Sequence, residues 1–273
     1  MSMQSLKHIA DWPVPNASTA VIGKDGGLLG SHGDQDRHYA LASVTKLLSA
    51  YAVLLAVEEG ALELDQPAGP EGSTVRHLLA HSGGYDFGDR SVRYTPGERR
   101  LYSNAGFEVL GETVEHATGM AFADYLRDGV LLPLGMQRTS LAGSPAAGAT
   151  STVADLSRFA AELQQPRLLD PSTLSEATSV VFPGLAGVLP GFGRQKDNDW
   201  GLGFEIRNGK QPHWTGGNSS PRTFGHFGQS GTFLWVDPEA GAACVTLTDR
   251  DFGPWAAEAW PAFTDAALAE LAT

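Results

Sequence analysis

The chain has 273 residues, of which 42% are hydrophobic, so it can bury a full core and is not a disordered protein. Nineteen basic residues stand against 31 acidic ones, and the net charge of −12 repels nucleic acids and anionic membrane surfaces. We therefore expect no nucleic acid and no membrane among its partners. The first 16 residues hold no apolar run typical of a signal peptide, which predicts a cytoplasmic protein.

Hydrophobic periodicity changes along the chain from strand to helix and back to strand. Residues 17–32 alternate around a Lys-Asp-Gly-Gly turn, the pattern of a β-hairpin. Residues 231–249 predict two further strands, and residues 254–272 predict an amphipathic helix. Between them, glycine and proline separate five predicted helices, at 43–59, 74–80, 104–118, 121–132 and 152–164.

Strands near both ends of the chain, with helices between them, predict the α+β class. We expect one antiparallel sheet built from both chain ends and flanked by terminal helices, with a mostly helical subdomain inserted. The predicted sheet subdomain comprises residues 1–42 and 200–273, and the helical subdomain residues 43–199. Together they would form a single globular unit with the active site at their interface.

The predicted helix 43–59 is apolar around most of its circumference, yet it carries Lys46 in its first turn. Burial disfavours a charged ammonium, so it would lower the pKa of Lys46 and make the amine a base. Ser43 precedes Lys46 by three residues and would lie on the same helix face. The pair forms a Ser-x-x-Lys sequence, at a helix N-terminus that favours a developing oxyanion.

A purely structural interpretation of this pair is also open. Ser43 can serve as the N-cap of the helix, and Lys46 can extend along its aliphatic stem to the surface. A Ser-x-x-Lys sequence also arises readily by chance, so the pair needs support from elsewhere in the chain.

Two further stretches carry polar side chains that suit a catalytic site. Tyr102 and Asn104 stand at a predicted helix start, where Asn104 can cap the helix or bind a substrate and Tyr102 can pack in the core or move a proton. His226 and Gly228 begin a predicted strand, and glycine there permits close approach of a ligand to the backbone.

In this order and spacing, the three stretches resemble the three motifs of the serine β-lactamase and penicillin-binding-protein superfamily, in its class C branch. That branch also holds D,D-carboxypeptidases, D-aminopeptidases and family VIII esterases. Residues 78–88 and 200–205 resemble further recurrent stretches, so the resemblance runs from about residue 17 to 250.

The resemblance implies a role for each motif residue. Ser43 would be the nucleophile that forms an acyl-enzyme, and Lys46 and Tyr102 would exchange its proton, with the base in acylation left open. Asn104 would bind the acyl side of the substrate, and His226 and Gly228 would line the cleft from an edge strand. The backbone N–H groups of Ser43 and Gln229 would form the oxyanion hole. The resemblance implies neither a cofactor nor a metal.

One departure from the family pattern bears on the substrate. Many relatives carry Lys-Thr-Gly as the third motif and bind a substrate carboxylate with it, whereas this chain has His226 and Phe227 in the first two positions. Histidine is mostly neutral at pH 7 and phenylalanine donates no hydrogen bond, so carboxylate capture should be weaker. Aromatic residues from Trp200 to Trp235 suit an apolar ester or amide. We therefore expect a carboxylic-ester hydrolase acting on small molecules, with at most weak β-lactam hydrolysis.

Other sites and functions remain as alternatives. Ser82 lies in an Ala-x-Ser-x-Gly sequence and could be a nucleophile with His226 as base, but a helix rather than the required strand is predicted before it. His77 and His81 have the i, i+4 spacing of metal ligands without a clear third ligand, so helix packing is favoured. Cys244 lies in a strand and is predicted to be buried.

The remaining alternatives concern the reaction itself. A β-lactamase, a D,D-carboxypeptidase or a D-aminopeptidase would use the same nucleophile on a different substrate. A catalytically idle binding protein would use the same fold without the chemistry. The oligomeric state cannot be predicted from the sequence.

Overall fold

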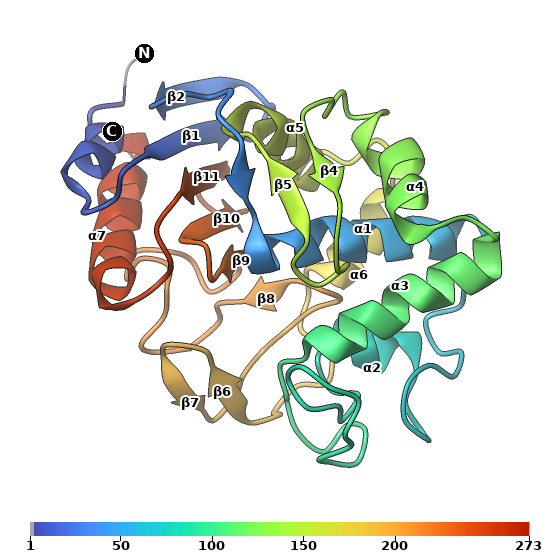
Figure 1. The fold of residues 1–273 in the computed structure, drawn as a ribbon. Coiled ribbons are helices and arrows are strands. Elements are labelled where there is room, and N and C mark those ends of the chain that lie inside the picture. Colours follow the sequence, from blue (N-terminus) through green and yellow to red (C-terminus); the bar gives the residue numbers. More distant parts are fainter. Residues whose placement is uncertain (1–2, 273) are drawn as a thin grey trace.

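The computed structural model describes residues 3–272 and contains one large, fully antiparallel sheet (Figure 1). In spatial order its strands are β2 (Leu28–His32), β1 (Ala17–Gly23), β11 (Ala242–Thr248), β10 (Thr232–Asp237), β9 (Phe224–Gly228) and β8 (Glu205–Ile206). Strand β1 pairs with β11 in a register that places Val21 opposite Cys244. The N-terminal hairpin therefore extends the group of C-terminal strands from its β11 side, which confirms the predicted α+β class and the sheet built from both chain ends.

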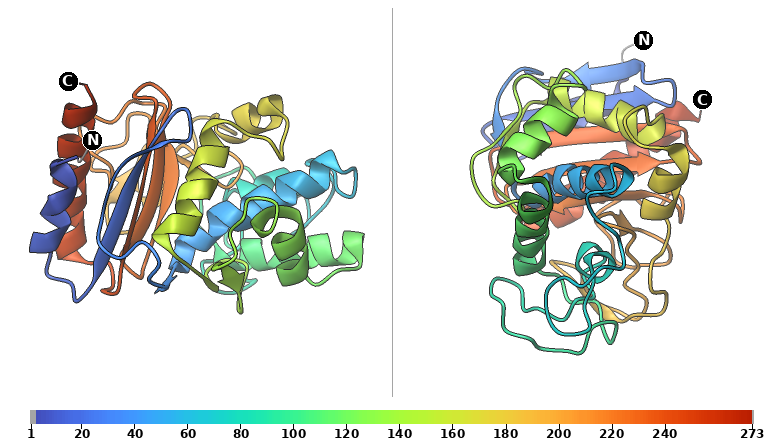
Figure 2. Two further views of the ribbon diagram at one scale, coloured as in Figure 1. Left: turned by 90° about the horizontal axis from the view of Figure 1, so that it is seen from above. Right: turned by 90° about the vertical axis from the view of Figure 1, so that its right-hand side faces the viewer.

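Helices cover both faces of this sheet (Figure 2). On one face lie α7 (Pro254–Leu271) and the short helix η1 (Ser5–Asp11), which Glu270 connects by accepting a 2.7 Å hydrogen bond from Ser5 Oγ. Trp235 on β10 and Trp260 on α7 are fully buried in this layer. The terminal helices therefore close one side of the sheet, and the catalytic candidates must lie on the other side or at an end.

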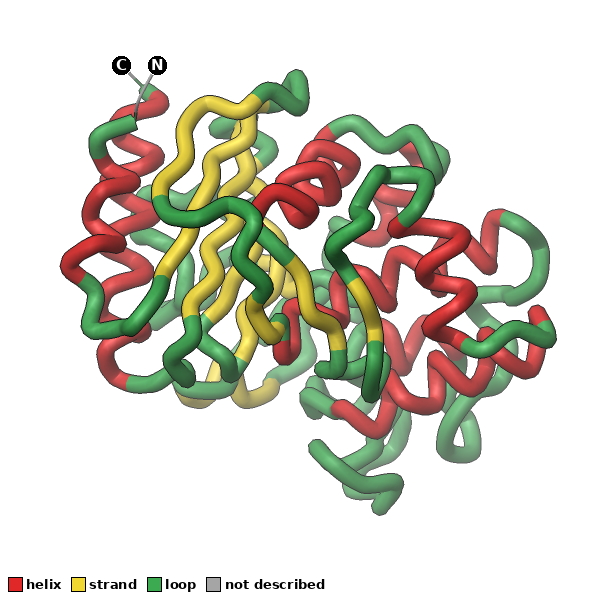
Figure 3. The backbone as a smooth tube through the Cα atoms, turned by 45° about the horizontal axis from the view of Figure 1, so that its top comes forward, coloured by secondary structure: helices red, strands yellow, loops and turns green. Residues whose placement is uncertain are grey.

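The other face carries the helical part of the chain (Figures 1 and 3). Its helices are η2 (Ala42–Val44), α1 (Thr45–Glu58), α2 (Val75–Leu79), α3 (Asn104–Thr118), α4 (Phe122–Leu126), the π-helical turn η3 (Arg127–Leu131), α5 (Val153–Gln164) and α6 (Pro171–Ala177). Small sheets accompany them, one of β3 (Tyr39–Ala40), β5 (Ala149–Ser151) and β4 (Ser140–Leu141) and one of β6 (Gly187–Leu189) and β7 (Gly193–Gln195).

All five internal helices predicted from the sequence are present, and polar residues begin three of them. The side chains of Thr74, Ser103 and Thr152 accept hydrogen bonds from backbone N–H groups in the first turns of α2, α3 and α5. The predicted helix 121–132 is divided into α4 and η3. The sequence prediction did not include α6, β6, β7 or η1, because these elements are short and carry little periodic signal.

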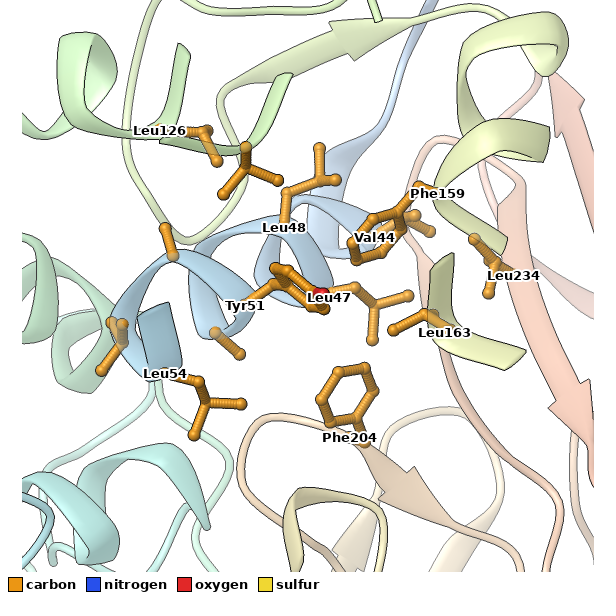
Figure 4. Close-up of a cluster of buried hydrophobic side chains, with 14 of the residues drawn as sticks. Val44, Leu47, Leu48, Tyr51, Leu54, Leu126, Phe159, Leu163, Phe204 and Leu234 are labelled. Carbon is orange, nitrogen blue, oxygen red and sulfur yellow. The ribbon is translucent and has the colours of Figure 1, made fainter. Parts of the chain in front are cut away.

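Helix α1 runs through the centre of the helical layer and is buried on nearly all sides (Figure 4). Leu47, Leu48 and Tyr51 are fully buried, and their neighbours come from α5 and from the sheet, including Phe159 and Leu234. The helix therefore holds its N-terminal turn rigidly, at the place where the helical layer meets the sheet. Within residues 3–272, no helix is both long enough and apolar enough to cross a membrane.

Candidate active site

Ser43 lies in the short helical turn η2, directly before α1. Ala42 has a φ of 44°, a left-handed conformation that is rare outside glycine and costs about 1–3 kcal/mol. Neighbouring strands fix this turn, because Leu41 N–H donates to Ala149 O at 2.9 Å and Thr232 Oγ1 donates to Leu41 O at 2.9 Å. The N-cap of α1 is Val44, so the interpretation of Ser43 as a helix cap is wrong.

Lys46 has no exposed surface, which excludes the alternative in which its ammonium reaches solvent. Its Nζ lies 2.6 Å from Asn104 Oδ1, 2.9 Å from Ala146 O and 3.4 Å from Ser43 Oγ. Burial lowers the pKa of Lys46 well below its usual value, and the charge of Glu108 opposes this only in part. Lys46 is therefore buried beside the Ser43 hydroxyl with a lowered pKa, as its place on an apolar helix predicted.

A buried arginine, Arg100, anchors the loop that carries the second motif. Arg100 donates to the backbone carbonyls of Ala80 at 2.6 Å and Val181 at 2.5 Å, so it joins the loop before α3 to two other segments. Tyr102 follows this anchor, and its ring centroid lies 4.7 Å from Lys46 Nζ. Burial raises the pKa of the Tyr102 phenol, and the nearby Ser43 hydroxyl offsets only part of the rise. Asn104 begins α3 but does not cap it, because Ser103 does.

The third motif lies at one end of β9, next to the Ser43 turn. A Cβ added to Gly228 would lie 2.4 Å from Leu41 O and 3.2 Å from Ala42 Cβ, so only glycine allows the strand this close to η2. Strand β9 is not the edge of the sheet, which corrects our expectation, because β8 pairs with it. That pairing covers only Phe224 and Gly225, and the end of β9 that carries His226 extends beyond it.

A small cavity of about 100 Å³ lies beside Ser43, and Lys46, Asn104 and Gly228 are not among the residues that line it. It is lined by Ser43, Phe87, Tyr102, Leu189, Pro190, Trp200, Glu205, His226, Phe227 and Gln229. A second cavity of about 230 Å³ shares Phe87, Tyr102 and Pro190 with the first. The two cavities therefore share Tyr102 in their walls, and of the predicted aromatic residues Trp200 and Phe227 line the cavity beside Ser43.

A buried ion pair forms part of the cavity wall. Glu205 Oε1 accepts hydrogen bonds from Lys210 Nζ at 2.7 Å and from His213 Nε2 at 2.8 Å, while Oε2 accepts from Trp214 Nε1 at 2.5 Å. Burial alone would raise the pKa of Glu205, but the charge of Lys210 and its other partners hold it well below the usual range. Glu205 is therefore an ionised carboxylate with its partners in place.

The alternative nucleophile and metal sites do not form as their sequence patterns suggested. Ser82 follows α2 rather than a strand and donates to His77 O at 3.2 Å, so the strand–turn–helix geometry of a nucleophile elbow is absent at this position. Helix α2 ends at Leu79, so His77 and His81 do not share a helix face. His77 bonds to Thr74, and His81 accepts from Ser103 N–H. Cys244 is buried in β11, as predicted.

Several residues of the site were not identified from the sequence. Ala146 contributes only a backbone carbonyl, which no side-chain pattern can indicate. Phe87 contacts both cavities from an irregular loop, and Glu205 meets Lys210 and His213 only in the folded chain.

Comparison with known proteins gives a consistent picture. The beta-lactamase family model matches residues 14–269. A β-lactamase crystal structure from Mycobacterium bovis is 56% identical, with a TM-score of 0.97, and the match covers 99% of this chain and 100% of that one. Simvastatin synthase from Aspergillus terreus shares the fold, with a TM-score of 0.79 at 17% identity over 98% of this chain and 93% of its own.

Curated relatives match over shorter stretches. Penicillin-binding protein 4* of Bacillus subtilis (strain 168) is 29% identical over 37% of this chain and 30% of its own length. D-aminopeptidase of Gluconobacter oxydans (strain 621H) is 32% identical over 24% of this chain and 13% of its own length. These matches thus span a third or less of the relatives. With the family model matched over nearly the whole chain, the protein belongs to the beta-lactamase family, whose members are serine hydrolases.

Proposed function

We propose that this protein is a carboxylic-ester hydrolase that forms an acyl-enzyme on Ser43. The observation that carries the proposal is the cavity of about 100 Å³ next to Ser43, which suits a short acyl group. Sites for drug-sized ligands typically enclose about 300–1,000 Å³. The adjoining cavity of about 230 Å³ gives the leaving alcohol its own space.

The contacts of Lys46 favour it as the base in acylation. A neutral lysine has two N–H groups and one lone pair, and Asn104 Oδ1 and Ala146 O take the two N–H groups. The lone pair is then left for the third neighbour, the Ser43 hydroxyl at 3.4 Å. Lys46 accepts the Ser43 proton while Ser43 Oγ attacks the ester carbon, and the backbone N–H groups of Ser43 and Gln229 bind the oxyanion.

Tyr102 acts as the acid in the same step. Its phenol donates a proton to the leaving alcohol oxygen as the ester bond breaks, and the Lys46 ammonium returns a proton to the phenolate. In deacylation the roles reverse: water attacks the acyl-enzyme, its proton passes to the catalytic pair, and the carboxylic acid leaves with Ser43 restored. Asn104 contacts the acyl side while it orients Lys46.

A second candidate is β-lactam hydrolysis, favoured by the 56% identity with the Mycobacterium bovis β-lactamase. We place it second because the third motif offers no lysine or hydroxyl for a substrate carboxylate, and burial lowers the pKa of His226 to about 3. Penicillin binding, suggested by the name of one curated relative, meets the same objection. D-aminopeptidase activity, suggested by the name of another, would need an anionic partner for a free amine, and Glu205, the carboxylate in the cavity lining, already bonds Lys210 and His213.

The test is turnover of p-nitrophenyl acetate and butyrate, nitrocefin, and a D-alanyl-D-alanine peptide by the wild type and by Ser43→Ala. We expect ester turnover that disappears in Ser43→Ala, with little turnover of the other two substrates. Ser82→Ala is the matched control and should retain activity. Faster cleavage of nitrocefin or of the peptide would reassign the substrate. The absence of both turnover and fluorophosphonate labelling of Ser43 would indicate an idle site.

A further inference from the structure

Two buried imidazole nitrogens beside Tyr102, His81 Nε2 and His226 Nε2, make no hydrogen bond to any described residue. Buried polar atoms are nearly always paired in native proteins, so an unpaired group in a site points to a missing partner. The three rings are neighbours, with centroids 4.6 Å apart for His81 and Tyr102 and 5.7 Å apart for Tyr102 and His226. The unpaired atoms therefore belong to one cluster beside Ser43.

The hydrogen bonds of His226 fix the position of its proton. His226 Nδ1 lies 2.6 Å from the carbonyl oxygen of Phe227, and because a carbonyl only accepts, Nδ1 carries the hydrogen. Burial lowers the pKa of His226 to about 3, against smaller opposing effects of Glu205 and Phe227 O. The ring is therefore neutral, and Nε2, on the side of the ring away from Nδ1, presents a lone pair.

His81 has the opposite arrangement. The backbone N–H of Ser103 donates to His81 Nδ1 at 3.2 Å, so the proton of neutral His81 is on Nε2. Burial lowers the pKa of His81 well below its usual value. His81 does not line the cavity, whereas His226 does. Of the two imidazoles, it is therefore His226 that can meet a substrate, and it meets the substrate as an acceptor.

Building on the ester hydrolysis proposed above, we propose that His226 Nε2 accepts a hydrogen bond from the substrate, and that the enzyme prefers esters whose leaving alcohol carries a second hydroxyl group. His226 packs beside Tyr102, the group that protonates the leaving oxygen, and the larger cavity opens at Tyr102. A neighbouring hydroxyl on the alcohol would thus pass His226. A carboxylate at that place would face the lone pair of His226 Nε2, which disfavours its binding. A cationic third motif would instead attract the carboxylate.

A matched pair of substrates tests this preference. 2-Hydroxyethyl acetate and 2-methoxyethyl acetate differ in the ability to donate a hydrogen bond, and acetoxyacetate presents a carboxylate at the same place. Acid release in a pH-stat gives kcat/KM for each. One hydrogen bond between neutral groups corresponds to about 3- to 10-fold, which is the preference for the hydroxyl ester over the methoxy ester expected in the wild type.

The ratio between the two esters is compared within each variant, so a change in overall activity does not affect it. His226→Phe removes the acceptor, and we expect a ratio near one. His226→Gln restores an acceptor oxygen and should recover part of the preference, while His226→Lys should shift the preference toward acetoxyacetate. His116→Gln, an exposed histidine on α3, is the control and should keep the wild-type ratio. A wild-type ratio near one, or a ratio unchanged in His226→Phe, would overturn the proposal.

A second measurement needs no turnover. In ¹⁵N-histidine-labelled protein, the two-bond ¹H–¹⁵N spectrum should contain one ring with a protonated Nδ1, unchanged from pH 8 to pH 5 and lost in His226→Gln. A proton on Nε2, or titration of this ring near pH 6.5, would contradict the proposal. If both esters are cleaved equally, the hydrolase function stands and this inference fails. If no ester is cleaved and Ser43 is not labelled, the proposed function fails as well.

Discussion

Gly228→Ala tests the close approach of β9 to the Ser43 turn without removing any side chain of the site. The added Cβ would lie 2.4 Å from Leu41 O, whereas ordinary contacts begin at 3.4 Å, so the strand or the Ser43 turn must move by about 1 Å (3.4 − 2.4). Leu41 O is a backbone atom that accepts a hydrogen bond from Thr232 Oγ1, which would itself lie 2.6 Å from the added Cβ. Ala42, whose Cβ would lie 3.2 Å away, already has a strained conformation. The displacement therefore changes the distance between Ser43 and the backbone N–H of Gln229.

We expect Gly228→Ala to lower kcat on p-nitrophenyl acetate by about 100-fold, the effect of a 1 Å misplacement in a catalytic site. This corresponds to about 2.7 kcal/mol of transition-state stabilisation. Overpacking should also lower the free energy of unfolding, by about 1–3 kcal/mol. Stopped-flow acylation and thermal unfolding measure the two effects separately.

The control is Gly209→Ala, whose added Cβ meets no atom within 4 Å and whose φ is not left-handed. Gly209→Ala should acylate at the wild-type rate. Wild-type acylation by Gly228→Ala would refute the argument, since it would mean that the oxyanion donors do not depend on the contact between β9 and η2.

Three further predictions concern buried titratable groups. Lys46→Met removes the base and should lower kcat by about 10²- to 10⁴-fold, with Lys24→Met as an exposed control. In the wild type, kcat/KM should fall as the pH drops through the lowered pKa of Lys46, because protonation removes the lone pair; an acid limb that instead disappears in His226→Gln would contradict this assignment. Glu205→Gln leaves Lys210 without its buried counter-ion and should cost about 3–5 kcal/mol of stability. That loss lowers Tm by roughly 6–20 °C, whereas the exposed Glu63→Gln should leave Tm unchanged.

The elements and catalytic groups that could be predicted from the sequence are those whose signal is local. Helix α1 is apolar all round, which predicts that it is buried. Ser43 lies in the helical turn η2 rather than in α1, but the spacing of three residues still places it beside Lys46. The turn residues between β1 and β2 predict the hairpin that these strands form. In each case the residues that form the structure are neighbours in the chain.

The features that could not be predicted depend on contacts between distant segments. Strand β8 has two residues and exists only because β9 pairs with it, so the expectation of an edge strand at β9 was wrong. The partners of Lys46 include a carbonyl 100 residues away, at Ala146. The tautomer of His226 depends on a hydrogen bond to the backbone oxygen of Phe227, and the residue types alone do not predict that bond.

Burial also explains why one site can supply a base and an acid from lysine and tyrosine. Removal from water penalises the charged form of each group, and it therefore lowers the pKa of Lys46 while it raises that of Tyr102. In the proposed mechanism both groups are neutral before the reaction, so Lys46 holds a lone pair and Tyr102 holds a proton. A solvated lysine would be an ammonium and could not accept the Ser43 proton. The apolar circumference of α1 thus sets the chemistry of the site as well as the packing of the core, because it keeps water from Lys46.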